Sequence, residues 1–225
     1  MRRYSTYSKE DILRVIKELI FCTRRQILLS LRGSEKRMKA LEYWLPELEE
    51  TQEIEVCWFQ GVKVYSAARR RRANVSVEHE VGVAECRVRL EVCRHDGIYV
   101  PGRRFKGMGI IPDGAIAYPN GNILAWEFTT RRNFSAGGVI KSKLTRYSNN
   151  LDAINNRFSR RTIVLFVIDD ERWRVRDFIL RNQPVGADFF WTDYQTFKQV
   201  PIGQQLTAEI YLWEDGKSYP LTSNE

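Results

Sequence analysis

Cysteine and histidine are scarce in this sequence, and their spacing argues against two classes of site. The chain has four Cys and two His in 225 residues. The cysteines show no CxxC spacing, and His79 and His95 alone do not supply the ligands of a zinc site. A disulfide scaffold and a zinc finger are therefore not expected, and reduced thiols predict a cytoplasmic location.

Long apolar runs are also missing. No segment approaches the roughly 18 apolar residues that cross a bilayer, and Met1-Arg2-Arg3-Tyr4 leads into polar residues instead of a signal-peptide core. We therefore expect no membrane insertion and no processing. The sequence has no internal repeat and no low-complexity tract, and its 43% hydrophobic and 12% aromatic residues exclude general disorder. One good core, with room for a small second domain, is the expected organisation.

Positive charge is what the chain has in excess. The formal net charge is +8 and the isoelectric point is about 9.4. The excess is concentrated near the N-terminus, because residues 1–76 hold 16 Lys and Arg against 10 Asp and Glu. A polyanion is the natural partner of such a surface.

Three helices are expected in the N-terminal third. Ser8 can cap a first helix, whose apolar residues recur with the spacing of one buried stripe. Thr23 can cap a second helix that Gly33 ends, and Ser34 then opens a third. The predicted order is helix, turn, helix.

A tight hairpin follows, because strands at 53–59 and 62–65 flank Gln60-Gly61. Three helices and a hairpin indicate a winged helix, which we assign to residues 1–68. Such a module presents its third helix to the major groove. The start of that helix and the wing are therefore expected to contact DNA through Lys36, Arg37, Lys39 and Lys63. A dimerisation or peptide-binding module is the alternative.

From residue 77 onward, helices and strands alternate. Amphipathic helices are expected from Val77 to about Arg94 and from Ile140 to Ile154, with a further helix at 172–180. Strands are expected at 97–100, 111–118, 122–129, 162–168, 189–192 and 206–213. The predicted fold class is α/β (α+β), with a helix-strand-strand-strand-helix-strand core on a mixed central sheet.

Two acids fall on adjacent predicted strands. Asp113 stands in the segment Ile-Ile-Pro-Asp-Gly, and Glu127 follows fourteen residues later in Ala-Trp-Glu-Phe-Thr. Because side chains alternate along a strand, Asp113 would share a face with Ala115, and Glu127 one with Ala125 and Thr129. Two carboxylates can then converge on one divalent cation, as in metal-dependent nucleases.

Each acid also has a purely structural interpretation. A lone Pro-Asp-Gly such as 112–114 is most often a turn. Glu127 lies between two aromatic residues, where an ionised carboxylate without a partner is costly, so the position demands a metal or a salt bridge. Arg131 or Arg132 could provide that salt bridge.

The helix from Val77 adds a third candidate acid. On a helical wheel, Glu85 lies about 40° from Val81, at the edge of the apolar stripe, whereas His79 points nearly opposite. Glu85 is therefore the better-aimed acid, with an ordinary helix-edge position as its alternative. His79 is expected to cap the helix or contact DNA.

This order of elements, with acids at these places, resembles the PD-(D/E)xK nuclease fold of restriction endonucleases and Holliday-junction resolvases over residues 77–170. More narrowly, the chain looks like the replication-relaxation family, which includes the MOBC plasmid mobilisation relaxases. The motifs that carry this resemblance are His79-Glu80-Val81, Pro112-Asp113-Gly114, Trp126-Glu127-Phe128 and Lys143-Leu144-Thr145-Arg146-Tyr147.

The resemblance implies that Asp113 and Glu127 hold Mg²⁺ or Mn²⁺, with Glu85 completing the shell. The usual pattern has Lys two residues after the strand acid, where this chain has Thr129. Lys143 lies about 60° from Ile140, near the buried stripe, and is the candidate replacement. Tyr147 could act as a relaxase nucleophile, but its stripe position favours core packing.

The expected function is a metal-dependent DNA endonuclease that nicks one strand at a plasmid origin of transfer, with other mobilisation or secretion-coupling proteins as further partners. A catalytically inactive DNA-binding accessory protein and a restriction-like double-strand cutter are the alternatives. The expected domains are 1–68, a basic linker at 69–76, a nuclease-like domain at 77–200 and an extension at 201–225. Further expected DNA contacts are Arg69, Arg70, Arg71, Arg72, Arg131 and Arg132.

Overall fold

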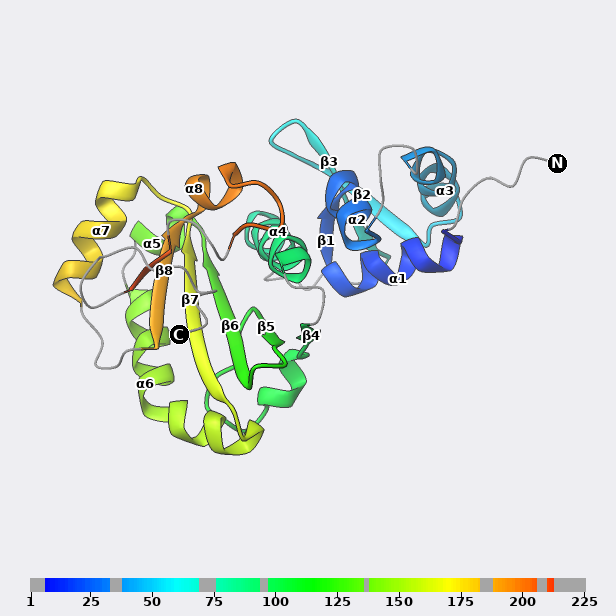
Figure 1. Ribbon diagram of the computed structural model, residues 1–225. Coiled ribbons are helices and arrows are strands. Elements are labelled where there is room, and N and C mark those ends of the chain that lie inside the picture. Colours follow the sequence, from blue (N-terminus) through cyan, green and yellow to red (C-terminus); the bar gives the residue numbers. More distant parts are fainter. Residues whose placement is uncertain are drawn as a thin grey trace. The chain divides into compact units, whose positions relative to one another are not determined.

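The computed structural model shows a chain of mixed α/β structure with two sheets, which confirms the predicted fold class at that level (Figure 1). The chain forms two compact units, residues 1–88 and 89–225. Within the described part, no helix is long and apolar enough to cross a membrane. The structure describes residues 7–32, 38–68, 76–93, 97–135, 138–182, 188–205 and 210–212.

The first unit begins with two capped helices. Ser8 caps α1 (Lys9–Leu19) and Thr23 caps α2 (Arg24–Ser30), each through a reciprocal capping box, as the sequence predicts. The third helix, α3, covers Met38–Glu50. The predicted helix stop at Gly33 and the start at Ser34 lie outside the described residues.

The predicted hairpin is confirmed. In β2 (Ile54–Phe59) and β3 (Val62–Ala67), Phe59 pairs with Val62. The turn residues Gln60 and Gly61 have φ angles of 49° and 76°, the positive values that a two-residue turn of this hand requires. A further strand, β1 (Phe21–Thr23), pairs with the other side of β3. Three residues are too few for a detectable alternation, so the sequence did not predict it.

Helix α4 (Val77–Cys93) contains the boundary between the two units. Its residues Ala84 and Val88 belong to the same core cluster as Ile12 and Ile16 of α1. The first unit therefore extends to residue 88, past the linker that the sequence places at 69–76. Ala84 and Val88, from the apolar stripe expected to pack on a sheet, lie in this cluster together with residues of helices α1 to α3 and of strands β2 and β3.

The second unit is built on a six-stranded mixed sheet, counted over the described residues, with the order β4-β5-β6-β7-β8-β9. Strands β6, β7 and β8 are parallel to one another, and the remaining pairings are antiparallel. The strand bounds are β4 Ile98–Tyr99, β5 Gly114–Ala117, β6 Asn122–Thr129, β7 Arg161–Ile168, β8 Phe189–Asp193 and β9 Tyr211–Leu212.

Helices cover the central strands of this sheet on both faces. Ile140 and Tyr147 of α6 (Gly138–Phe158) and Val175 of α7 (Arg172–Arg181) pack with Phe166 in one buried cluster. Tyr194 of α8 (Tyr194–Gln199) contacts the ring of Phe128, which points to the other face. The short helices η2 (Gly102–Phe105), α5 (Arg131–Ser135) and α8 span too few residues for the sequence to show a period.

Gly114 opens β5 because no other residue fits there. Its partner across the strand pair is Trp126. A Cβ at position 114 would lie 2.0 Å from a carbon of the Trp126 ring. The Pro-Asp-Gly segment therefore ends in close strand packing, and Asp113 is held directly beside β6.

We expect Gly114→Ala to lower the free energy of unfolding by about 1–3 kcal/mol, the usual cost of overpacking a core. Gly138→Ala is the matched control, because a Cβ there meets no atom within 4 Å. Urea denaturation followed by circular dichroism measures both variants. Equal stability of Gly114→Ala and the wild-type chain would contradict the close contact with Trp126.

Candidate active site

The strand register brings the two predicted acids together. β5 and β6 run antiparallel with Gly114 opposite Trp126, so Asp113, one residue earlier, lies beside Glu127. The Phe128 backbone N–H donates a hydrogen bond of 2.8 Å to Oδ2 of Asp113. The Asp113 carboxylate is therefore held by the neighbouring strand and is not simply part of a turn.

Glu127 is fully buried and receives two donors from α6. The hydroxyl of Tyr147 donates to Oε1 at 2.7 Å, and the ammonium of Lys143 donates to Oε2. Nζ of Lys143 also lies 3.4 Å from Oδ2 of Asp113. One positive charge therefore contacts both carboxylates, and the partner that buried Glu127 requires is Lys143.

Helical spacing explains why both donors come from α6. Lys143 and Tyr147 are four residues apart, so they lie on the same face of the helix. Ile140 and Leu144 anchor that face in the core. The Tyr147 ring is itself fully buried, and its ring centroid lies 6.3 Å from that of Phe166. The expected core packing of Tyr147 is therefore found together with a polar contact that the sequence did not predict.

The charges in this cluster perturb one another. Burial and the nearby charge of Asp113 raise the pKa of Glu127 to about 8, although Lys143 and Tyr147 oppose them. Burial lowers the pKa of Lys143, but the attraction of Glu127 and Asp113 outweighs it and raises the pKa overall. Burial, followed by the Glu127 charge, raises the pKa of Tyr147. When Glu127 is ionised, two carboxylates face a single ammonium, and the site is then short of positive charge.

A pocket of about 410 Å³ adjoins the cluster, and Glu127 and Lys143 contribute to its lining. Gly107 and Gly109 form part of its wall and have φ angles of 87° and 76°. Arg146, which the sequence analysis did not single out, also lines the pocket. Its position three residues after Lys143 is the signal that would have found it, because residues three apart share a helix face.

Glu85 accepts a hydrogen bond from a side chain of the first unit. The side-chain amide of Gln26 donates to Oε2 of Glu85 at 2.9 Å. His79 lies in the first turn of α4, where its backbone N–H bonds to Oγ of Ser76 at 3.4 Å. The proposed metal-ligand role of Glu85 and the DNA contact of His79 stay predictions.

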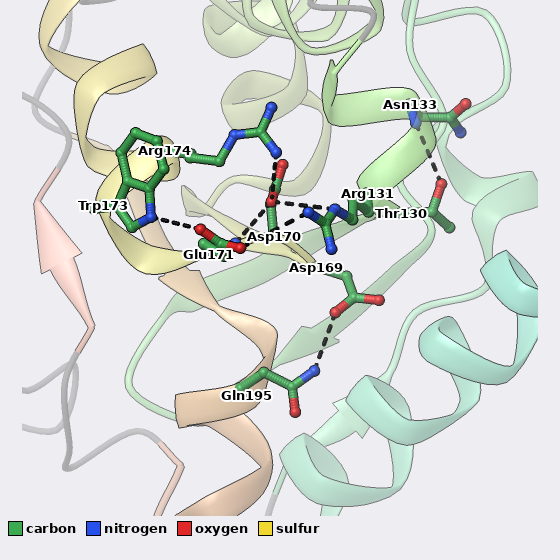
Figure 2. A network of polar contacts seen from close by, with 9 residues as sticks. All are labelled: Thr130, Arg131, Asn133, Asp169, Asp170, Glu171, Trp173, Arg174 and Gln195. Atoms are coloured by element: carbon green, nitrogen blue, oxygen red, sulfur yellow. Dashed lines mark hydrogen bonds and ion pairs between the residues drawn. The ribbon is translucent and has the colours of Figure 1, made fainter.

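The predicted DNA-contacting residues fall into two groups. Lys39 on α3 is exposed, and Lys63 on β3 is exposed with its ammonium 3.8 Å from Glu49. Arg131 forms ion pairs of 3.7 Å with Asp170 and 3.8 Å with Glu171, as Figure 2 shows, and so does not neutralise Glu127. Arg132 is exposed on α5. Residues that lie outside the described part are Lys36, Arg37, Arg69, Arg70, Arg71 and Arg72.

The acid pair suits a hard divalent cation. In the described part of the chain, no three His, Cys, Asp or Glu side chains gather to hold a metal. Mg²⁺ needs no such set, because one or two carboxylates bind it together with water and substrate phosphate. Asp113 and Glu127 supply two carboxylates within reach of one cation, as their shared contact with Lys143 demonstrates. The residues present therefore fit such an ion.

Comparison with models of known protein families, with curated proteins and with solved structures finds no match. Inference about function therefore rests on the residues and geometry of this chain.

The raised pKa of Glu127 predicts a pH dependence of stability. Because its folded value, about 8, exceeds the ordinary 4.5, the stabilisation is fully present below about pH 4.5 and is lost as pH rises through about 8. Relative to Glu127→Gln, the wild-type chain should lose up to about 1.4 kcal/mol of unfolding free energy per pH unit in this window. Urea titrations of both proteins at several pH values measure the difference.

An opposite trend, with the wild-type chain gaining stability over the variant as pH rises, would contradict this assignment. That result would mean that Lys143 holds Glu127 ionised well below neutral pH.

Proposed function

We propose that this chain is a metal-dependent DNA endonuclease in which Asp113 and Glu127 bind the cation and Lys143 assists. The observation that carries the proposal is the contact of one ammonium, Lys143, with two carboxylates from adjacent strands, beside a pocket that Glu127 and Lys143 help to line. Phosphodiester hydrolysis develops negative charge on phosphate oxygens, and a divalent cation held by the two acids, together with the Lys143 ammonium, would stabilise that charge.

Each residue would have a distinct task. When bound, Mg²⁺ or Mn²⁺ supplies positive charge at the scissile phosphate and lowers the pKa of a coordinated water. Asp113 and Glu127 hold the ion, and their orientations are fixed by the Phe128 N–H and the Tyr147 hydroxyl. The Lys143 ammonium, which contacts both acids, would add positive charge at the phosphate. Buried Tyr147 orients Glu127 and does not attack DNA.

The wider architecture supports a nuclease of the PD-(D/E)xK type. Helix α4, strands β4, β5 and β6, helix α6 and strand β7 follow the element order expected for that fold. Three helices and a hairpin in the first unit support a winged helix, with Lys39 and Lys63 exposed where duplex DNA would be read. The net charge of +8 supports a nucleic-acid substrate.

The more specific proposal is a relaxase that nicks one strand at a plasmid origin of transfer, together with other mobilisation or secretion-coupling proteins. It is supported by the short motifs around His79, Asp113, Glu127 and Lys143. A nickase needs one active site for its product, whereas a double-strand cutter needs two. The product, nicked circle or linear DNA, therefore separates these two enzymes.

A second candidate is a catalytically inactive DNA-binding accessory protein. The observation that favours it is that Lys143 already contacts both acids, so the cluster holds together without a metal. In such a scaffold, Lys143 would be a structural partner of a buried carboxylate. Replacing it would then change stability and leave no activity to lose.

We predict that Asp113→Asn, Glu127→Gln and Lys143→Met each reduce plasmid nicking by roughly a thousandfold, because each removes several kcal/mol of transition-state stabilisation. Binding to duplex DNA should be unchanged. Arg157→Met is the matched control for Lys143→Met, because it removes one exposed positive charge from the last turn of the same helix. Nicking of supercoiled plasmid on agarose gels is the measurement. Wild-type rates in the two acid variants would disprove the site.

Metal dependence is tested with supercoiled plasmids that carry or lack a candidate transfer origin. We expect nicked circles with Mg²⁺ or Mn²⁺ and no product with EDTA, because Asp113 and Glu127 lose the ion that they hold. Linear product would favour the double-strand cutter. Equal absence of product under every condition, with duplex binding retained, would favour the inactive accessory protein.

A further inference from the structure

A second hollow of the second unit, whose lining shares no residue with the pocket beside Glu127, lies between α7 and residues of α5 and α6. It is a groove of about 640 Å³. Lys141 contributes to it from α6, and Trp173, Arg174 and Arg181 contribute from α7. The proposed cleavage reaction uses none of these residues.

Trp173 is placed as an aromatic platform. Its side chain is 67% exposed, whereas Val175 and Ile179 of the same helix are buried in the core. The indole N–H donates to Oε2 of Glu171 at 2.5 Å, so its polar edge has a hydrogen-bond partner (Figure 2). An exposed indole with its polar edge already bonded offers its apolar face to a ligand.

Basic side chains outnumber acidic ones in the lining of this groove. Lys141, Arg174 and Arg181 line it together with one acid, Asp177, and the acids Asp170 and Glu171 contact Arg174 and Trp173. Nη1 of Arg174 lies 3.4 Å from Oδ1 of Asp170, whose side chain is fully buried (Figure 2). This ion pair positions the guanidinium. Arg181 lies 2.8 Å from Asp177, at the exposed end of α7.

The start of α6 adds to the same field. Gly138, its first residue, lines the groove, and the first turn of the helix has no acid. Backbone N–H groups at a helix start favour anions. The groove therefore combines the exposed face of Trp173 with basic side chains and with the backbone N–H groups at the start of α6.

We infer that this groove binds single-stranded nucleic acid, with a base stacked on Trp173 and phosphates contacted by Lys141, Arg174 and Arg181. Single strands are bound in this way, by aromatic platforms along a cationic groove. Duplex DNA does not suit the groove, because its bases are already stacked on one another. An acidic peptide would use the cations and leave the indole face without a matching partner. The inference goes beyond strand cleavage and holds whether or not the acid pair is catalytic.

The test is fluorescence anisotropy of a labelled oligodeoxythymidine of about 12 nucleotides, the scale of one single-strand site, with the full chain in EDTA. We expect Trp173→Ala to weaken binding by roughly five- to a hundredfold, and Trp173→Phe to restore most of it. Leu180→Ala is the control, because Leu180 is 51% exposed on the same helix, α7, and does not line the groove. It should bind like the wild-type chain.

Charge variants give a second readout. A plot of log affinity against log salt has a negative slope. Lys141→Gln and Arg181→Gln should each make this slope less steep by roughly 0.7, the value for one phosphate contact on a single strand. Arg157→Gln, an exposed change on α6 outside the groove, should leave the slope unchanged.

Several outcomes would overturn the inference. They are no binding of the oligonucleotide by the wild-type chain, equal binding by Trp173→Ala, an equal loss in Leu180→Ala, and equally strong competition by duplex DNA or polyglutamate. Because EDTA prevents cleavage, these measurements report binding at the groove and not the proposed nuclease reaction. The groove and the proposed nuclease site can therefore fail independently.

Discussion

The burial of one carboxylate, Glu127, is the constraint around which the second unit is organised. It lies in the middle of an apolar sheet, where an acid without partners would be strongly destabilising. Tyr147 and Lys143 reach it from α6, and Asp113 shares the same lysine. Helix α6, the strands β5 and β6 and the candidate site thus depend on the same few polar contacts. With both acids ionised, a cluster of two carboxylates and one ammonium is suited to accept a further positive charge.

Helix α6 serves two surfaces of the unit through its periodicity. Lys143 and Tyr147 face the sheet, whereas Lys141, two residues earlier, lines the groove beside α7. Residues two apart on a helix point in nearly opposite directions. A single element can therefore position residues of the proposed metal site and of the proposed strand-binding groove at once.

Much of this site could be predicted because it follows from local periodicity. Strand alternation set Asp113 and Glu127 on one face, the bounds of β6 matched the expected 122–129, and the helical wheel placed Lys143 beside the buried stripe. Other features depend on distant contacts. The hydroxyl of Tyr147, the glycine wall of the pocket and the packing of Ala84 against α1 arise from residues far apart in sequence. No local pattern encodes them.

The central claim is that Asp113 and Glu127 share one divalent cation. Anomalous diffraction from crystals soaked in Mn²⁺ tests it most directly, because manganese is located independently of any activity. The account predicts one manganese peak in contact with both carboxylates, with the Lys143 ammonium moved from its position between them. Saturating Mn²⁺ with no peak at this pair, and Lys143 still bonded to Glu127, would contradict it.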